Sequence, residues 1–246
     1  MIKKAASYLK LSNHAVVLTG AGVSTPSGIP DFRSTDDGLW QKYNPMEVAS
    51  LTAFRTNPEK FYNWFRPMAK LIAEASPNPA HEALAQLEQA NYIKEIITQN
   101  IDGLHQRAGS EIVHEVHGTL NTLTCGKCYT KYQAEEFMHS YIEEGHIPKC
   151  KQCDHYLKPD AILFEEQLPI LTWMAVEEAI GKCDLLLVAG SSLEVVPVAR
   201  LPYAAVSHGA KLIIINHTET YIDSRADIVI NQDVADILPL ITNELL

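Results

Sequence analysis

The chain has 246 residues, of which 46% are hydrophobic and 20% are charged, a composition typical of a globular protein rather than a disordered one. Twenty Lys and Arg residues against thirty Asp and Glu residues give a formal charge of −10. This charge disfavours a nucleic-acid-binding protein, whose affinity comes from basic residues that neutralise phosphates, and favours a basic, lysine-bearing partner.

The length exceeds that of a usual single domain of roughly 100–200 residues but falls short of two full domains. We therefore expect one large domain carrying a smaller insert. The basic amino-terminal segment has no following apolar run of about 7–15 residues, so it does not resemble a signal peptide, and a cytoplasmic location is expected. The longest apolar stretches, 185–189 and 212–215, fall far short of the roughly 18–20 residues of a transmembrane helix, so no membrane span is expected.

Short apolar runs with uncharged interiors predict strands that are buried on both faces of a parallel sheet. The clearest runs are 14–19, 184–189 and 211–216, and the runs 94–98 and 227–230 add two more. Helix-like segments at 78–90 and 171–180 lie between strands, and the second is expected to end before Gly181. About five or six strands with covering helices indicate an α/β fold, a Rossmann-like doubly wound parallel sheet.

Two Cys-x2-Cys pairs form the strongest local pattern. The pair Cys125 and Cys128 is separated by 21 residues from the pair Cys150 and Cys153, close to the spacing of zinc ribbons. Four sulfur ligands leave no open position for water or substrate, so we expect one structural zinc ion per chain. The alternatives are four reduced surface cysteines or a nucleic-acid-binding ribbon. The ribbon is disfavoured because 119–157 has four lysines against five acids and therefore no basic face.

The two stretches that do not fit the strand and helix alternation are expected to form the smaller domain. This domain would consist of residues 34–75, a helical module, and residues 119–157, the zinc module. The Rossmann-like domain would consist of residues 1–33, 76–118 and 158–246. Because the chain has no repeat or flexible linker, we expect the two parts to pack together and the cleft between them to bind the ligands.

Glycine-rich and polar loops predict a nucleotide site. Gly20-Ala21-Gly22-Val23-Ser24 follows the first strand and predicts a turn into a helix, where the backbone approaches a pyrophosphate. An ordinary dehydrogenase is disfavoured, because the third glycine of its fingerprint is replaced by Thr25 and no acid follows at a strand end about 20 residues on. The segment 27–33 and the loop 98–105, which has four polar side chains, are both expected to grip a ligand.

In order and spacing, these features together resemble the sirtuins over nearly the whole chain. The matching segments are 20–33, 98–109, His117-Gly118, the paired cysteines and Gly190-Ser191-Ser192. The resemblance, to the bacterial and archaeal type, implies a Rossmann-like domain and a smaller helical and zinc-bearing domain, with NAD and an acyl-lysine peptide entering the cleft from opposite sides. It implies an NAD-dependent protein-lysine deacetylase that uses NAD as a co-substrate, passes the acyl group to ADP-ribose and releases nicotinamide and O-acetyl-ADP-ribose.

The resemblance also implies which residues contact NAD. They are Gly20, Ala21, Gly22, Thr25, Asp31, Phe32, Arg33, Gln99, Asn100, Ile101, Asp102, His117, Gly190, Ser191, Ser192 and Asn216. Asp102 is expected to accept a hydrogen bond from the nicotinamide carboxamide. Asn216 ends an apolar strand, where it could reach the adenosine ribose or, alternatively, form a turn before Thr218.

The expected catalytic residues are His117 and Asn100. His117 follows a β-like run at 112–116, and the ordinary histidine pKa of about 6.5 suits a general base at neutral pH. The resemblance implies that the acyl oxygen attacks the nicotinamide ribose and that His117 then accepts a proton from a ribose hydroxyl, so that the acyl group migrates.

The acylated peptide is expected to lie as an added strand between 161–164 and 193–196. Its expected contacts are Ile162, Leu163, Phe164, Val195 and Val196. Sirtuins usually have Phe-Gly-Glu where this sequence has Phe164-Glu165-Glu166, and we expect this glutamate to alter the approach of the peptide backbone or to favour basic flanking residues. Members that remove succinyl groups carry Tyr-x-x-Arg, but here Phe65 stands three residues after Tyr62 and Arg66 comes one place later, which favours acetyl.

Three alternatives remain open at this point. The same cleft could transfer ADP-ribose to a protein side chain, or the deacylase could prefer a longer acyl group. A non-catalytic NAD- or zinc-dependent binding module is disfavoured, because both His117 and Asn100 are present. The expected partners are acetylated lysines in proteins or peptides, with neither nucleic acid nor membrane.

Overall fold

The computed structural model describes residues 1–31 and 43–246. Its larger sheet has six parallel strands in the order β3, β2, β1, β7, β8, β9. These strands are β1 (Ala15–Thr19), β2 (Glu95–Thr98), β3 (Val113–Glu115), β7 (Leu185–Ala189), β8 (Lys211–Ile215) and β9 (Ile228–Ile230). The order changes direction at β1, which lies between β2 and β7, and open α/β sheets bind ligands outside the carboxyl ends of the strands at such a switch point.

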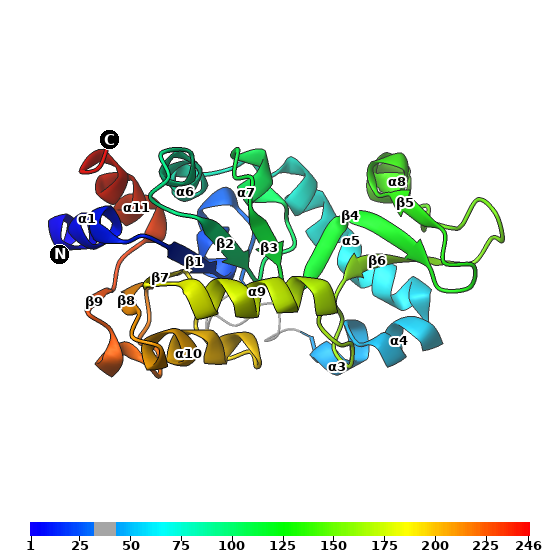
Figure 1. Cartoon of the computed structure of the whole chain (residues 1–246). Coiled ribbons are helices and arrows are strands. Elements are labelled where there is room, and N and C mark those ends of the chain that lie inside the picture. The colour runs from blue at the N-terminus through cyan, green and yellow to red at the C-terminus, as the bar shows by residue number, and fades with distance from the viewer. Residues whose placement is uncertain (32–42) are drawn as a thin grey trace.

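Helices cover both faces of this sheet (Figure 1). On one face α1 (Ile2–Leu11), α6 (Pro79–Gln89) and α11 (Val234–Asn243) share a core with Val17, and on the other α9 (Ile170–Lys182) and α10 (Leu201–Ser207) share a core with Val16 and Leu18. Successive side chains of a strand point to opposite faces, so burial of both faces explains the unbroken apolar run of β1. The expected doubly wound, Rossmann-like fold is confirmed.

Helix α9 does not end before Gly181, as the sequence analysis expected, but continues to Lys182. A glycine ends a helix mainly when it adopts a left-handed conformation just beyond the last turn. Here the chain leaves the helix in an extended conformation at Cys183, and a Cβ added to Gly181 would have no neighbour within 4 Å. The glycine is therefore an exposed helix residue rather than a cap.

The smaller lobe, on the right in Figure 1, contains a three-stranded antiparallel sheet in the order β5, β4, β6. The strands are β4 (Gly118–Cys125), β5 (Lys131–Gln133) and β6 (Leu157–Ala161), and the accompanying helices are α3 (Pro45–Val48), α4 (Leu51–Thr56), α5 (Pro58–Glu74), α8 (Glu135–His139) and the π-helix η3 (Ser140–Glu144). An aromatic core that includes Phe61, Tyr62 and Tyr141 holds the helices together. A second small core surrounds Cys125 and Cys150.

Short elements complete the described part of the chain. They are α7 (Leu104–Arg107) and the 3₁₀ turns η1 (Ala21–Val23), η2 (Thr25–Ser27), η4 (Val198–Arg200) and η5 (Asp223–Arg225). Among the described helices, none combines the length and the apolarity needed to cross a membrane. Phe32 and Arg33, which are expected to contact NAD, lie outside the described residues.

Candidate active site and metal centre

The loops that follow β1 and β7 touch each other at the switch point of the large sheet. A Cβ added to Gly20 would lie 2.8 Å from the backbone oxygen of Gly190, and one added to Gly22 would lie 2.9 Å from the same atom. Gly190 has a φ of +60°, and a Cβ there would lie 2.5 Å from the amide nitrogen of Val23. Contact between the two loops is therefore one reason for the glycines, and the approach of a pyrophosphate to this turn stays a prediction.

The turn after β1 leads into η1 and η2 rather than into the expected α-helix. Pro26 has no N–H to continue a helical ladder, and Gly28 has a left-handed φ of +86° that ends the second turn. Ala21 is half-buried, Thr25 is exposed and the Oγ1 of Thr25 donates to the Gly22 oxygen over 3.1 Å. These short turns leave the loop compact and folded back on itself.

Asn100 connects the loop after β2 to the loop after β1. Its Nδ2 donates to the Gly20 oxygen over 3.0 Å and to the Ser24 Oγ over 2.9 Å. A carbonyl oxygen can only accept, so these contacts fix which end of the amide is the nitrogen and occupy both of its protons. The Oδ1 of Asn100 is then the side-chain atom that can meet a ligand.

Asp102 lies in the same network. One carboxylate oxygen accepts from the Ser24 Oγ over 2.7 Å, and the other accepts from the Leu104 amide over 2.9 Å. The second contact anchors the start of α7, since Gly103 immediately before this helix has no side chain. Each carboxylate oxygen accepts about two hydrogen bonds, so Asp102 retains acceptor capacity for a donor on a ligand. Ser24 was not among the site residues expected from the sequence, because its role depends on a contact with a residue 78 positions away.

A series of hydrogen bonds between buried polar side chains connects these loops to the strands that precede them. The Thr19 Oγ1 donates to the Thr98 Oγ1 over 2.8 Å, and the Thr98 Oγ1 accepts from the Asn100 amide over 3.1 Å. The Nε2 of His105 lies 2.9 Å from the Thr19 Oγ1. Because the Thr19 hydroxyl proton is directed at Thr98, His105 is the donor in this contact. Neither Thr19 nor the buried His81, which packs against His105, was predicted to be a site residue.

His117 lies between β3 and β4, where the two sheets meet. Its Nδ1 is 3.0 Å from the backbone oxygen of Gln99, and its own backbone oxygen accepts from the Ile162 amide over 2.7 Å. A carbonyl oxygen only accepts, so Nδ1 carries the proton and Nε2 is the basic nitrogen of the ring. The side chain of Gln99 donates to the Ser191 Oγ over 2.8 Å. Gln99 therefore joins the candidate base to the loop after β7.

The remaining expected cofactor residues lie in different surroundings. Ser191 is buried and also accepts from the Leu193 amide over 3.3 Å, which leaves its hydroxyl proton to donate, whereas Ser192 is exposed. Asp31 and Ile101 are half-buried. The Nδ2 of Asn216 donates to the Thr218 oxygen over 2.9 Å, which matches the turn-forming alternative, so its contact with a ribose stays a prediction.

The segment expected to bind the peptide is largely hydrogen-bonded within the chain. Leu163 is buried in the aromatic core of the smaller lobe, and its amide donates to the Glu166 Oε2 over 2.8 Å. The Phe164 amide donates to the Ala49 oxygen over 3.0 Å. Ile162 is half-buried, while Phe164 and Val196 are 39% and 58% exposed and offer apolar surface. Val195 is half-buried, and its oxygen accepts from Ala199.

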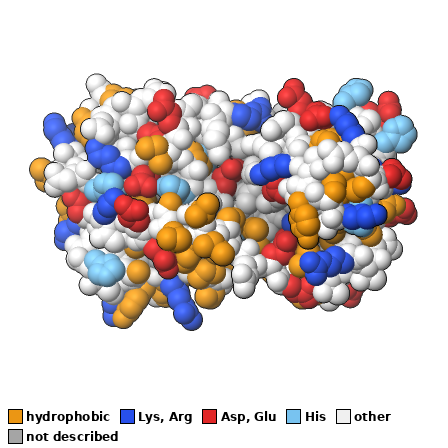
Figure 2. All heavy atoms as spheres, turned by 45° about the vertical axis from the view of Figure 1, so that its right-hand side comes forward, with side chains coloured by type: hydrophobic (Ala, Val, Ile, Leu, Met, Phe, Trp, Pro, Cys, Tyr) orange, Lys and Arg blue, Asp and Glu red, His pale blue; other side chains and the backbone are white. Residues whose placement is uncertain are grey.

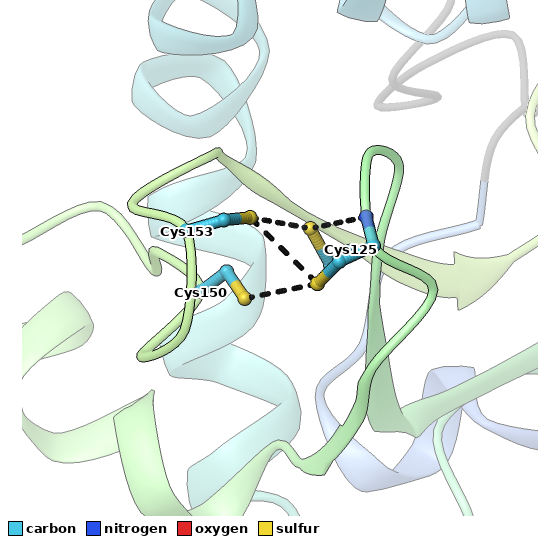
Figure 3. Close-up of side chains that lie close together, drawn as sticks. Cys125, Cys150 and Cys153 are labelled. Carbon is cyan, nitrogen blue, oxygen red and sulfur yellow. Dashed lines mark hydrogen bonds between the residues drawn. The ribbon is translucent and has the colours of Figure 1, made fainter.

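The four paired cysteines converge on one point of the smaller lobe. Their sulfur atoms lie within 4.8 Å of one another and belong to two loops that face each other, as the three labelled cysteines in Figure 3 show. The Sγ separations are 3.5 Å for Cys125 and Cys153, 3.4 Å for Cys128 and Cys150, and 3.7 Å for Cys128 and Cys153. A tetrahedral zinc ion with Zn–S bonds of about 2.3 Å places its sulfurs about 3.8 Å apart, so the cluster fits one structural ion.

The lysines near this cluster do not form a basic face. Lys131 pairs with Asp160, Lys149 with Asp154 and Lys151 with Glu136. On the face shown in Figure 2, basic and acidic side chains are interspersed over the right-hand lobe. This distribution argues against the nucleic-acid-binding ribbon that the cysteine spacing left as an alternative.

Comparison with known proteins agrees with this geometry. The sequence model of the Sir2 family matches residues 20–197. NAD-dependent protein deacylase 2 of Archaeoglobus fulgidus is 49% identical over 246 residues, covering 99% of this chain and 95% of that protein. An NAD-dependent protein deacetylase of Sulfurisphaera tokodaii is 42% identical over 240 residues, covering 98% of this chain and 94% of that protein. The chain therefore belongs to the Sir2 family.

Solved structures extend the likeness to the whole fold. A structure of a Sir2 protein with a p53 peptide and NAD+ superposes with a TM-score of 0.90 at 38% identity, covering 99% of this chain and 98% of that one. Another, of a Sir2 protein bound to a myristoylated histone peptide, has a TM-score of 0.85 at 41% identity and covers 99% of this chain and 95% of that one.

Proposed function

We propose that this chain is an NAD-dependent protein-lysine deacetylase that transfers the acyl group from lysine to ADP-ribose and releases nicotinamide and O-acetyl-ADP-ribose. Family membership and relatives named deacetylase or deacylase support the reaction. The observation that carries it is the position of Gln99, which links the candidate base His117 to the loops at the switch point through two hydrogen bonds. One edge of the sheet thus holds both the candidate base and the polar groups of the loops after β2 and β7.

Different side chains bind NAD and accept the proton. NAD, when bound, supplies a positively charged nicotinamide as leaving group. The carboxylate of Asp102 accepts from its carboxamide, and the Oδ1 of Asn100 and the hydroxyl of Ser191 meet polar atoms of the ribose and phosphate region. The Nε2 of His117 accepts the ribose hydroxyl proton, while its Nδ1 proton stays on the Gln99 oxygen. Preorganised groups of this kind accelerate a reaction because they need no reorientation in the transition state.

The aromatic core supports acetyl over succinyl. The hydroxyl of Tyr62, which is 2% exposed, donates to the Leu157 oxygen over 2.6 Å. Arg66 donates to the backbone oxygens of Ile142 and Glu143 over 2.8 and 2.9 Å. Neither side chain is therefore placed to receive a carboxylate on the acyl group, as the Tyr-x-x-Arg pair of succinyl-removing sirtuins does.

Three wider features belong to the same proposal. We place the cofactor domain at residues 1–33, 76–118 and 158–246 and the smaller domain at residues 34–75 and 119–157, with the ligands between them. We expect a cytoplasmic protein, since four of its cysteines converge as reduced metal ligands. We expect acylated lysines in proteins as partners, and neither nucleic acid nor membrane.

The test is mass spectrometry of acetyl-, myristoyl- and succinyl-lysine peptides incubated with the protein and NAD. Loss of the acetyl group with one nicotinamide released per lysine, and with formation of O-acetyl-ADP-ribose, is the expected result. A gain of one ADP-ribose on the peptide or the protein would favour the transferase alternative. Faster removal of myristoyl would favour a long-chain deacylase, and NAD-independent or absent turnover would overturn the proposal.

A further inference from the structure

Residues 162–166, here called the peptide-lining segment, include three of the expected peptide contacts. The segment is joined to α4 and to the residues just before it by backbone hydrogen bonds and by one side chain. The Phe164 amide donates to the Ala49 oxygen over 3.0 Å, and the Leu51 amide donates to the Phe164 oxygen over 3.0 Å. The Thr52 amide donates to the Glu165 Oε2 over 2.9 Å. These contacts make a short parallel bridge with a carboxylate at its end.

The same contacts cap the first turn of α4. The first amides of a helix have no partner inside the helix and need other acceptors. The Ala53 amide finds the Ser50 Oγ over 3.0 Å, whereas the amides of Leu51 and Thr52 find Phe164 and Glu165. Two of the three capping acceptors of α4 thus come from a segment more than a hundred residues away.

The backbone of Glu165 has a left-handed φ of +74°. Glycine adopts this conformation without a steric cost, and other residues do not, so a glutamate here needs a compensating contact. The carboxylate bond to Thr52 is that contact. Hydrogen bonds from the side chain and backbone of Thr52, with a smaller effect of Arg55, hold the pKa of Glu165 below its usual range.

The other end of the segment is fixed to the candidate base. The Ile162 amide donates to the His117 oxygen over 2.7 Å. The Leu163 amide is held by Glu166, whose carboxylate also pairs with the Lys158 Nζ at 2.8 Å. The peptide-lining segment is therefore hydrogen-bonded at one end to His117, the candidate base, and at the other end to the helices of the smaller lobe.

We propose that Glu165 is a positioning residue that holds the peptide-lining segment against α4, with its carboxylate bound to the first turn of that helix. The effect on peptide KM rests on the proposed deacetylase function, whereas the capping of α4 by Glu165 does not. This is a third role beside the two earlier expectations for this glutamate, and it rests on the hydrogen bond that its carboxylate accepts from the Thr52 amide.

The experiment compares Glu165→Ala, Glu165→Gln and Glu165→Gly with Glu244→Ala, an exposed glutamate at the end of α11, as control. Hydrogen exchange of the Thr52 amide is measured in the full chain. Steady-state KM is measured for NAD and for two acetyl-lysine peptides, one with neutral and one with arginine neighbours.

We expect Glu165→Ala and Glu165→Gly to expose the Thr52 amide and to raise the KM of both peptides about fivefold, the effect of losing one capping hydrogen bond. The KM for NAD should stay unchanged. Glu165→Gln keeps an oxygen that accepts from Thr52, so it should behave like the control.

Four results would overturn the inference. Unchanged exchange of Thr52 in Glu165→Ala would show that the carboxylate does not cap α4. If the Thr52 amide were exposed in Glu165→Ala but not in Glu165→Gly, the effect of the alanine variant would come from its strained left-handed backbone and not from the lost carboxylate. A higher KM of Glu165→Gln for the arginine-flanked peptide alone would show that the charge reads the substrate, and altered exchange with normal peptide KM would remove the role in binding. If the protein removes no acyl group, the proposed function fails, whereas the exchange data still test the capping of α4 by Glu165.

Discussion

The imidazole rings of His81 and His105 meet edge to face beneath the cofactor loops, with their centroids 4.9 Å apart. His105 is 1% exposed and His81 is fully buried. Burial lowers the pKa of His81 to about 4, against a smaller opposing effect of Asp102. Burial, with a smaller contribution from His81, lowers the pKa of His105 to about 3. Both rings are therefore neutral in the folded protein at ordinary pH.

This pair predicts a loss of stability in mild acid. Unfolded histidines bind protons below about pH 6.5, whereas the folded pair does not until pH 3 to 4, so the unfolded state binds more protons in between. The stabilising contribution of the neutral pair is fully present above about pH 6.5. The free energy of unfolding should therefore fall by up to about 5 kcal/mol on going from pH 7 to pH 4.5. Burial raises the pKa of Glu115, so this residue binds a proton more readily in the folded state and opposes the loss of stability in acid. Urea midpoints at the two pH values measure this, with His208→Gln as a surface control, and equal midpoints would contradict it.

The second prediction concerns the candidate base. His117→Ala should lower kcat for deacetylation by about 10²- to 10⁴-fold, the usual cost of losing a general base. The melting temperature should stay within a few degrees of wild type, because the hydrogen bond from Ile162 goes to the backbone of residue 117 and survives the substitution. His208→Ala is the matched control. Near-normal turnover of the His117 variant would refute the assignment.

The third prediction distinguishes two effects of replacing a glycine with alanine, namely backbone strain and a steric clash of the new Cβ atom. Gly190→Ala forces both a left-handed alanine and a Cβ 2.5 Å from a backbone nitrogen, whereas Gly28→Ala, with a φ of +86°, has no atom within 4 Å of the new Cβ. The Gly28 variant should therefore lose only about 1–2 kcal/mol from its backbone conformation, and the Gly190 variant should lose more and bind NAD weakly. Denaturant unfolding and NAD titration measure the two effects. Equal losses would show that the two loops separate easily.

The fourth prediction concerns the four cysteines. Removing the metal with a chelator should lower the melting temperature and, as a consequence, the activity, because a closed four-thiolate site contributes directly to folding. Cys150→Ser should do the same, whereas Cys183→Ala, which alters a buried cysteine outside the cluster, should leave one zinc per chain by elemental analysis. Full stability of a verified metal-free protein would be the contrary result.

Much of the candidate site follows from local pattern. The Cys-x2-Cys pairs predicted the metal centre because two ligands three residues apart can share one ion wherever the loop lies. The loops after the first two strands were expected to bind a ligand, because ligands bind at the carboxyl ends of parallel strands. The structure adds that Asn100, in the second loop, contacts the loop after β1. Ser24 and His81 were missed, since neither carries a local pattern that distinguishes it from a turn or a helix residue.

The sequence by itself determined the parallel sheet, the helices on its two faces and the cysteine cluster. It could do so because a strand buried on both faces must be apolar throughout, and because ligand spacing is a local property. Only the tertiary structure decided that His81 packs on His105, that the glycine loops press on each other, and that the carboxylate of Glu165 reaches an amide 113 positions away. Such contacts depend on how whole elements pack, and a residue's sequence neighbours do not record which distant group its side chain will meet.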